Sequence, residues 1–348
     1  MRKKLSLMVE LDDQTLAYLE EHFEVFRFSK GEPGRDQAAG EEETLAHLAS
    51  VRPEVAIIEQ EPITEKVLTA AAPDLRFIAS VRASWTNIDI PACAARGVVV
   101  TNAPGRNAVA VVEMTIGFMI CLSRFIPQTH HQIMIGNMTL EPGTPTDTKD
   151  ILWQHADLKN NPYVLYRGIE IDGRTLGLVG FGIIGAQLAP KARALGMRVL
   201  VSDPYVDAGR IEAVGAEKVE MDQLLAEADY VSLHAKVTPE TKGMFGWKQF
   251  DKMKPRAFFI NTARGALVNE KDLLKALTEK RIAGAALDVF NQEPLYHDSP
   301  FLKLDNVILT PHIGGATRDG IKHQSRLILD NVKAYIEGRE PPNLIKKN

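Results

Sequence analysis

The 348-residue sequence has very little cysteine. Cys93 and Cys121 are its only two, and each lies in an apolar segment with helical spacing. Two isolated cysteines provide no disulfide framework and no thiolate metal site. This scarcity favours a protein of the reducing cytoplasm, and we predict no bound metal.

Long apolar runs and an excess of positive charge are lacking as well. No apolar run approaches the ~20 residues that a membrane helix needs, and the basic start is followed too soon by acidic residues for a secretory signal. The 41 Lys and Arg residues against 45 Asp and Glu give a formal net charge of −4, unlike the basic surface of a nucleic-acid binder. We therefore predict neither a membrane nor a nucleic acid as a partner.

Short apolar runs alternate with segments of helical spacing along most of the chain. Strands are predicted at 5–9, 55–58, 77–80, 98–101 and 175–179, and around Val199, Tyr230, Phe258, Ala285 and Val307. Such alternation is typical of parallel sheets, and 348 residues exceed what one hydrophobic core usually supports. The predicted fold class is α/β, with two Rossmann-like, doubly wound parallel-sheet domains.

The first of these domains is predicted to be discontinuous. It comprises 1–103 and 316–348, because the helix expected at 318–337 is too short to fold alone and should pack on the first unit. The second domain takes 104–315, beginning with a long apolar helix at 107–125 that Pro127 should end. An insertion near 137–166, rich in Pro, Thr, Asn and Asp, is either an arm that reaches toward a partner subunit or a plain surface loop.

A glycine motif follows the strand predicted at 175–179 and opens a helix. It reads Gly180-Phe181-Gly182-Ile183-Ile184-Gly185. Its three glycines suit a tight turn, close approach of a pyrophosphate and close helix packing, and the helix N-terminus offers N–H groups to phosphate. Asp203 closes the next strand, where an acid accepts a hydrogen bond from the ribose 2′-hydroxyl and repels a 2′-phosphate. The pattern predicts NAD as cofactor and 104–315 as the NAD-binding domain; the plainer alternative makes the glycines turn residues and Asp203 a helix cap.

Three further candidates stand at predicted strand ends, where open sheets bind ligands. They are Arg264, Glu293 and His312. A planar guanidinium suits a substrate carboxylate, and a histidine beside an acid suits proton transfer to a carbonyl oxygen. Taken singly, each has a structural alternative: a surface ion pair, a cap before Pro294 or a core histidine.

With these motifs in place, the sequence resembles the D-isomer-specific 2-hydroxyacid dehydrogenases, a family that includes phosphoglycerate, glycerate and D-lactate dehydrogenases and glyoxylate reductases. The resemblance is to a short, phosphoglycerate dehydrogenase-like form without a regulatory domain. It implies hydride transfer between nicotinamide and C2 of a D-2-hydroxy or 2-oxo acid. It also implies that His312 donates the proton, that Glu293 orients the His312 imidazole, and that Arg264 binds the substrate. His234, Ala263 and Asp288 are expected beside the cofactor, with Asp288 within reach of the nicotinamide amide.

The loop expected to bind the substrate carboxylate departs from the family pattern. Arg82, Ala83 and Ser84 stand where the family usually has a glycine-rich stretch, so its standard conformation is not assumed. One hypothesis places Arg82 in the substrate pocket, favouring a phosphorylated or polyhydroxylated acid such as 3-phosphoglycerate. The alternative leaves Arg82 in solvent.

Related enzymes are commonly dimers, so we expect a homodimer through the cofactor domain. Two other functions stay open at this point. An NAD(H)-sensing corepressor-like binding protein of the same fold would use protein contacts as output. A formate dehydrogenase would lack the acid that Glu293 supplies.

Overall fold

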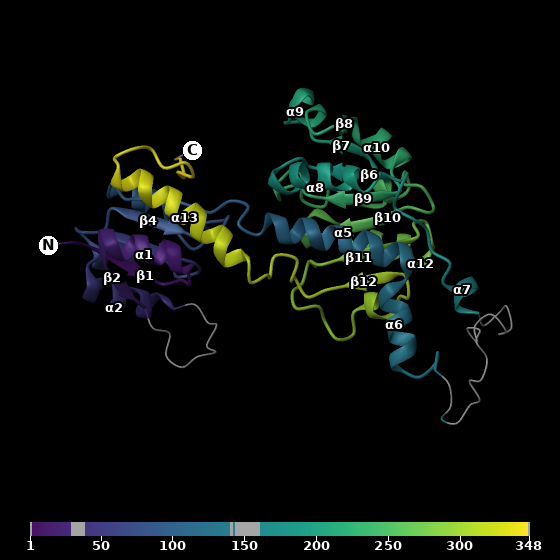
Figure 1. Ribbon diagram of the computed structural model, residues 1–348, viewed down its shortest axis with the longest axis horizontal. Helices are drawn as coiled ribbons and strands as arrows, with labels where there is room; N and C mark the ends of the chain where they lie inside the picture. Colours follow the sequence, from purple (N-terminus) through teal and green to yellow (C-terminus); the bar gives the residue numbers. More distant parts are fainter. Residues whose placement is uncertain (1, 29–38, 140–141, 143–160, 347–348) are drawn as a thin grey trace. The chain divides into compact units, whose positions relative to one another are not determined.

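The computed structural model describes residues 2–28, 39–139, 142 and 161–346 (Figure 1). Its internal contacts divide the chain into two compact units. Unit 1 comprises Met1–Asn107 and Ala316–Asn348, and unit 2 comprises Ala108–Gly315. The role of unit 1 in substrate binding stays a prediction, and most of the insertion predicted near 137–166, including Trp153, lies outside the described residues.

Unit 1 is built on a five-stranded sheet in the order β2-β1-β3-β4-β5, in which every neighbouring pair is parallel. This is the strand order of flavodoxin-like doubly wound folds. Along the chain its elements are β1 (Lys3–Leu7), α1 (Asp13–His22), β2 (Phe23–Arg27), α2 (Glu41–Val51), β3 (Val55–Ile58), α3 (Glu65–Ala71), β4 (Phe77–Ser80), α4 (Ile90–Ala95), β5 (Val99–Thr101) and α13 (Gly320–Ile336).

Helix α13 packs on the sheet of unit 1, although more than 200 residues separate it from β5 along the chain. Ile328 and Val332 are fully buried in one core cluster with residues of β1, β3 and β4. Tyr335 stacks on Phe77 of β4 with ring centroids 4.5 Å apart. The prediction that the final helix packs back on the first unit is confirmed, since its apolar face finds a sheet to cover.

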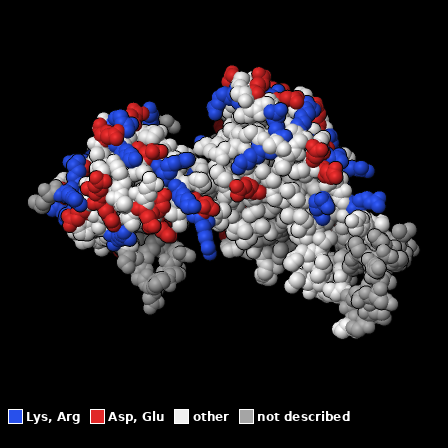
Figure 2. All heavy atoms as spheres, in the orientation of Figure 1, with Lys and Arg blue, Asp and Glu red and all other residues white. Residues whose placement is uncertain are grey.

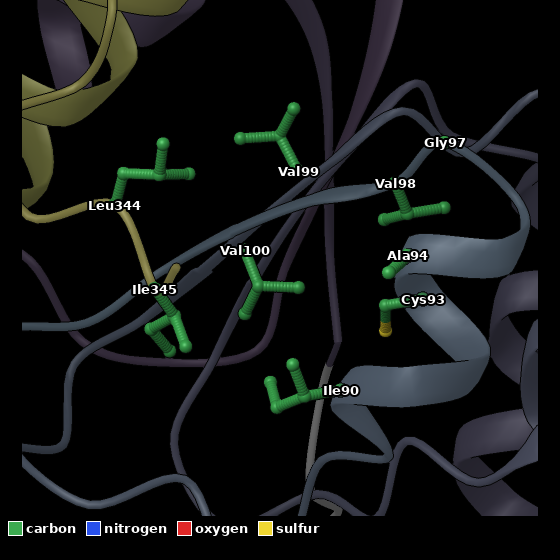
Figure 3. A pocket seen from close by; sticks show the side chains of 9 residues that line it. All are labelled: Ile90, Cys93, Ala94, Gly97, Val98, Val99, Val100, Leu344 and Ile345. Carbon is green, nitrogen blue, oxygen red and sulfur yellow. The ribbon is translucent and has the colours of Figure 1, made fainter. Parts of the chain in front are cut away.

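A small apolar cavity of about 250 Å³ lies at the β5 edge of this sheet (Figure 3). The side chains that line it come from α4, β5 and the C-terminal segment, where Ile345 donates its N–H to Val100. Burial raises the pKa of the Cys93 thiol at its wall to about 11, so this cysteine stays protonated and unreactive.

Unit 2 is built on a seven-stranded parallel sheet in the order β12-β11-β10-β9-β6-β7-β8. Its helices and strands along the chain are α5 (Ala108–Arg124), α6 (Ile126–Met134), α7 (Pro162–Leu165), β6 (Thr175–Val179), α8 (Ile183–Ala194), β7 (Arg198–Ser202), α9 (Ala208–Glu212), β8 (Glu217–Lys218), α10 (Met221–Glu227), β9 (Tyr230–Leu233), α11 (Trp247–Phe250), β10 (Phe258–Asn261), α12 (Glu270–Thr278), β11 (Gly284–Leu287) and β12 (Val307–Leu309). The described residues of this unit also form the 3-10 turns η2 (Gly265–Leu267) and η3 (Pro300–Lys303). Its central strands are buried along their whole length, which explains their largely apolar sequences.

Helix α5 lies against this sheet and buries Val112, Phe118 and Met119 in the core shared with β6 and α8. It ends at Arg124, which confirms the end predicted near residue 125. Pro127 stands in the first turn of a second helix, α6, which was not predicted; a proline at a helix start removes only an unused N–H. Among the described residues no single helix is long and apolar enough to span a membrane; α5 and α6 reach that length only as a pair bent by 66°.

Candidate active site

The carboxyl ends of the unit 2 strands meet at one edge, and the strand order reverses between β6 and β9. The chain first moves from β6 through β7 to β8, then crosses back to β9 and continues to β12. Ligands of open α/β sheets bind outside the carboxyl ends at such a reversal. The segment 180–185 leaves β6 at this point and leads into α8.

The three glycines of this segment have different surroundings. Gly180 has φ +97°, and a Cβ there would stand 2.8 Å from the Ala235 nitrogen on the neighbouring strand end. A Cβ on Gly185 would stand 2.6 Å from the Gly180 oxygen, so this glycine allows α8 to approach the loop closely. A Cβ on Gly182, the N-cap of α8, would meet no protein atom within 4 Å. The first and third glycines thus fit the fold, whereas the second leaves open space in front of a helix N-terminus, which suits a pyrophosphate.

Asp203 lies just beyond β7 and ties this loop to the next one. Its Oδ2 accepts a hydrogen bond from the Phe181 N–H at 2.7 Å, and its Oδ1 accepts one from the Tyr205 N–H at 2.9 Å. The Phe181 side chain is buried in the core, whereas Ile183 is 48% exposed. Each carboxylate oxygen has further lone pairs, so the half-buried Asp203 keeps the capacity to accept from a ribose hydroxyl.

His234 follows β9 and sits behind Gly180. Its Nε2 lies 2.9 Å from the Ser232 hydroxyl, and its Nδ1 is buried without a hydrogen-bond partner among the described residues. Burial lowers the pKa of His234 to about 4. The imidazole is therefore neutral near pH 7, with one ring nitrogen unused beside the glycine loop.

Arg264 stands in a turn that follows β10. Asn261 shapes this turn, because its Nδ2 donates to the Arg264 oxygen at 3.0 Å and its Oδ1 accepts from the Ala263 N–H at 3.0 Å. The guanidinium is exposed, and its Nη1 donates to the Ala263 oxygen at 2.7 Å. A Cβ on Gly265 would lie 2.0 Å from the Phe290 carbonyl carbon, so the Arg264 turn packs directly on the main chain that leads to Glu293.

Glu293 and His312 form a hydrogen-bonded pair at this edge. The His312 Nδ1 lies 2.7 Å from the Glu293 Oε2, with side chains 47% and 35% exposed. The other carboxylate oxygen of Glu293 accepts the Phe290 N–H at 2.9 Å. Because Nδ1 faces the acid, Nε2 is the ring nitrogen available to a substrate.

Burial raises the pKa of the Glu293 carboxyl, but the hydrogen bonds from His312 and the Phe290 N–H outweigh it, together with the charges of His312 and Arg264. The net effect is a pKa below the ordinary value for glutamate. Glu293 is therefore a carboxylate at neutral pH and presents a negative charge to the His312 Nδ1.

Asp288, directly after β11, is only 1% exposed. It accepts three hydrogen bonds from the segment that follows β12, one from a threonine hydroxyl and two from main-chain N–H groups. These are internal contacts, and the nicotinamide contact expected for Asp288 stays a prediction.

The remaining predicted residues belong to unit 1. The loop after β4 carries Arg82, half-buried, and Ala83 and Ser84, both exposed. Its main chain is anchored, since the Ala103 N–H donates to the Arg82 oxygen at 3.0 Å and the Asn102 Nδ2 donates to the Ala83 oxygen at 2.7 Å. The Arg82 guanidinium has no hydrogen-bond or ion-pair partner in the part of the chain that the structure describes.

Sequence reasoning missed four supporting residues of unit 2, namely Ser232, Asn261, Gly265 and Thr310. Each acts on a residue that the motifs did identify. Asn261 carried a signal, since an Asn at a strand end often hydrogen-bonds the main chain two or three residues on. Among the described residues no group of three or more His, Cys, Asp or Glu side chains is placed to hold a metal ion.

Residues 116–314 match the family described as D-isomer specific 2-hydroxyacid dehydrogenase, NAD binding domain. That span contains every unit 2 residue of the candidate site described above.

Individual relatives agree with this match. A glyoxylate reductase from Thermococcus litoralis is 37% identical over 289 residues, which is 82% of each chain. A D-3-phosphoglycerate dehydrogenase from Archaeoglobus fulgidus is 34% identical over 292 residues, covering 84% of this chain and 51% of that protein. Among solved structures, a glyoxylate reductase from Paecilomyes thermophila superposes with a TM-score of 0.74 at 25% identity, over 99% of this chain and 98% of the other.

Proposed function

The chain belongs to the D-isomer specific 2-hydroxyacid dehydrogenase family, and from that premise we propose which residues carry its reaction and which acids it accepts. The enzyme is an NAD-dependent oxidoreductase of 2-hydroxy acids. The observation that carries the assignment of residues is the 2.7 Å contact between Glu293 and His312. The pair lies at the carboxyl ends of the unit 2 strands, as do the Gly180–Gly185 loop and the exposed Arg264.

In the direction of reduction, the bound nicotinamide cofactor supplies a hydride to C2 of the 2-oxo acid. His312 gives the proton from its Nε2 to the carbonyl oxygen, which becomes the hydroxyl group. Arg264 binds the substrate carboxylate through its planar fork and polarises the carbonyl group. Glu293 holds the imidazole and balances its positive charge. In oxidation, neutral His312 takes the hydroxyl proton back.

The segment from β6 through α8 to β7 would hold the cofactor. The open space at Gly182 and the N–H groups at the start of α8 would receive its pyrophosphate, with Ile183 and Ile184 beside it, and Asp203 would accept a hydrogen bond from the ribose. Ala263 and the neutral His234 are the residues proposed for the rest of the dinucleotide.

The substrate proposed is a D-2-hydroxy acid that carries a second anionic or hydroxylated group, such as 3-phosphoglycerate. Its support is the half-buried Arg82, whose guanidinium has no partner in the described part of the chain. Arg106, also in unit 1, is different, because it pairs with Glu59 at 2.8 Å. A cation without an internal partner is available to a phosphate or a hydroxyl group.

The test compares NADH consumption with glyoxylate, pyruvate and 3-phosphohydroxypyruvate for wild type, His312→Ala and Arg82→Ala. We expect turnover in the wild type, its loss in His312→Ala, and a drop in kcat/KM of about tenfold or more for the phosphorylated acid alone in Arg82→Ala. Unchanged kcat/KM on every accepted acid in Arg82→Ala would refute the substrate class. Tight NADH binding without turnover of any acid would refute the enzyme and favour the sensor.

A homodimer through unit 2 is proposed from its exposed apolar surface. Helix α6 buries none of its residues and contains no Lys, Arg, Asp or Glu, and Figure 2 shows an uncharged surface there. Its exposed apolar side chains include Ile133 at 54% and Met134 at 70%. A hollow of about 790 Å³ between α6, the end of α7 and the amino ends of β10 to β12 adjoins them. Exposed apolar side chains on a helix without charged residues are typical of protein interfaces.

Light scattering coupled to size exclusion tests this interface. Met134→Asp should halve the particle mass, whereas Leu195→Asp, at another exposed apolar position of unit 2, should leave it unchanged. A monomeric wild type, or a dimer that Met134→Asp leaves intact, would contradict the proposal.

A further inference from the structure

Asp288 makes contacts that serve the segment carrying His312. Its Oδ1 accepts the Thr310 hydroxyl at 2.5 Å and the Ile313 N–H at 2.9 Å, and its Oδ2 accepts the Gly314 N–H at 2.8 Å. These donors flank His312 on both sides. One buried carboxylate at the end of β11 therefore organises the turn at the end of β12.

That turn has a backbone conformation that needs support. His312 has φ +56°, in the left-handed region, and its N–H donates to the Thr310 oxygen at 3.0 Å. For a residue other than glycine this region costs about 1 kcal/mol or more, and it persists only where the surroundings hold it. The three bonds to Asp288 are charge-assisted, and such bonds are stronger than neutral ones.

Gly314 completes the arrangement. A Cβ at this position would lie 2.7 Å from the Asp288 Oδ2. Only glycine therefore lets the main chain approach the carboxylate closely enough to donate its N–H. The Thr310-Pro311-His312-Ile313-Gly314 sequence supplies one hydroxyl and two N–H donors for a single acid.

We infer that Asp288 is a positioning residue for the proton donor: it fixes the main chain on both sides of His312, so that the imidazole meets Glu293. This deepens the proposed function and rests on it. It differs from direct contact with the nicotinamide amide, because the acid then acts before any cofactor binds.

The test is Asp288→Asn. An amide keeps the size of the side chain but presents an NH₂ group to one of the main-chain donors, so a bond to the turn is lost. We expect kcat to fall about tenfold or more, as slight misplacement of a catalytic group does, while the Kd for NADH changes less than about twofold. Solvent isotope effects on kcat should rise, because proton transfer then limits the reaction.

A readout without cofactor separates the two roles. In ¹⁵N-histidine-labelled apoprotein, side-chain ¹H–¹⁵N spectra report the tautomer and hydrogen bond of His312, assigned with His312→Asn. We expect these signals to move in Asp288→Asn. Unchanged signals together with a raised Kd for NADH would overturn the inference and assign Asp288 to the cofactor.

Two further variants guard the result. Thr310→Val replaces Asp288→Asn as the test if the latter does not fold. It removes only the hydroxyl donor, so we expect the same changes on a smaller scale. Asp229→Asn is the matched control. Asp229 lies directly before β9, at the amino ends of the unit 2 strands, and accepts the Thr175 N–H at 2.9 Å, so it also binds main chain but far from His312. This variant should lower stability without moving the His312 signals. If the wild type turns over no acid, the proposed function fails, and the apoprotein spectra still decide the role of Asp288.

Discussion

Replacing Glu293 with Gln removes one negative charge and keeps the shape of the side chain. The pair with His312 is 2.7 Å long, but its side chains are 47% and 35% exposed, so water screens much of the attraction. A charge-assisted hydrogen bond contributes about 1.5 to 3 kcal/mol. With screening, we take the lower end of this range, about 1.5 kcal/mol, which corresponds to about one pH unit.

The pH limbs of the two directions of the reaction should move the same way, but the effect on the rate should be opposite. Reduction needs imidazolium, so in Glu293→Gln the alkaline limb of its kcat/KM profile should move about one pH unit toward acid. Oxidation needs neutral imidazole, so its acid limb should move the same way, and the variant should oxidise better than expected at low pH. Initial rates of NADH formation and consumption across the pH range measure both limbs.

The control for this prediction is Glu270→Gln. Glu270, at the start of α12, accepts the Asn291 N–H at 2.6 Å. Asn291 belongs to the same loop as Glu293, but Glu270 makes no described contact with the His312 imidazole. Its removal should leave both limbs in place. If Glu293→Gln lowers the rate equally at every pH while the limbs stay put, Glu293 acts through orientation alone and the electrostatic reasoning is wrong.

Three other expectations follow from the geometry of unit 2. Gly265→Ala places a Cβ against the Phe290 main chain and should lower the free energy of unfolding by about 2 kcal/mol along with kcat/KM, whereas Gly182→Ala, with open space around it, should keep Tm and weaken NADH binding. Asp203→Ala should raise the KM for NADH and narrow its preference over NADPH, as paired kinetics would report. His234 is neutral when folded, with a pKa of about 4 against its ordinary 6.5, so its stabilising contribution is present above pH 6.5 and is lost as pH falls toward 4. His234→Gln should make the acid loss of stability about 2 kcal/mol shallower in urea titrations at about pH 7 and 4.5; equal slopes would contradict the burial argument.

The parts of the fold that the sequence predicted well are those whose residues face only other protein. Strand β6 begins and ends as predicted, because both of its faces are buried and Thr175 is its only polar residue. Strand β2 was missed, since at the edge of its sheet Phe23–Arg27 mixes charged and apolar residues. The two-residue β8, at the edge of the other sheet, carries no apolar signal at all.

The site shows the same division between local and distant causes. The glycine motif is local, so its strand, turn and helix could be predicted together. The left-handed backbone of His312 could not, because it depends on Asp288, 24 positions earlier in the chain. Resemblance indicated which residues matter, but it gave Asp288 a ligand contact where the structure describes three bonds to the neighbouring turn.

Three acids at the carboxyl ends of the unit 2 strands accept main-chain N–H groups, but they differ in how many carboxylate oxygens remain free to bind a catalytic group or a ligand. Asp203, Asp288 and Glu293 each accept at least one main-chain N–H from a loop. Asp288 is buried and uses both oxygens on the turn, so an amide there should act through structure. Glu293 gives one oxygen to the main chain and the other to His312, so an amide there should keep the loop and change the charge. Asp288→Asn should therefore lower the free energy of unfolding more than Glu293→Gln does. Glu293→Gln should in turn shift the pH profile of kcat/KM more than Asp288→Asn does.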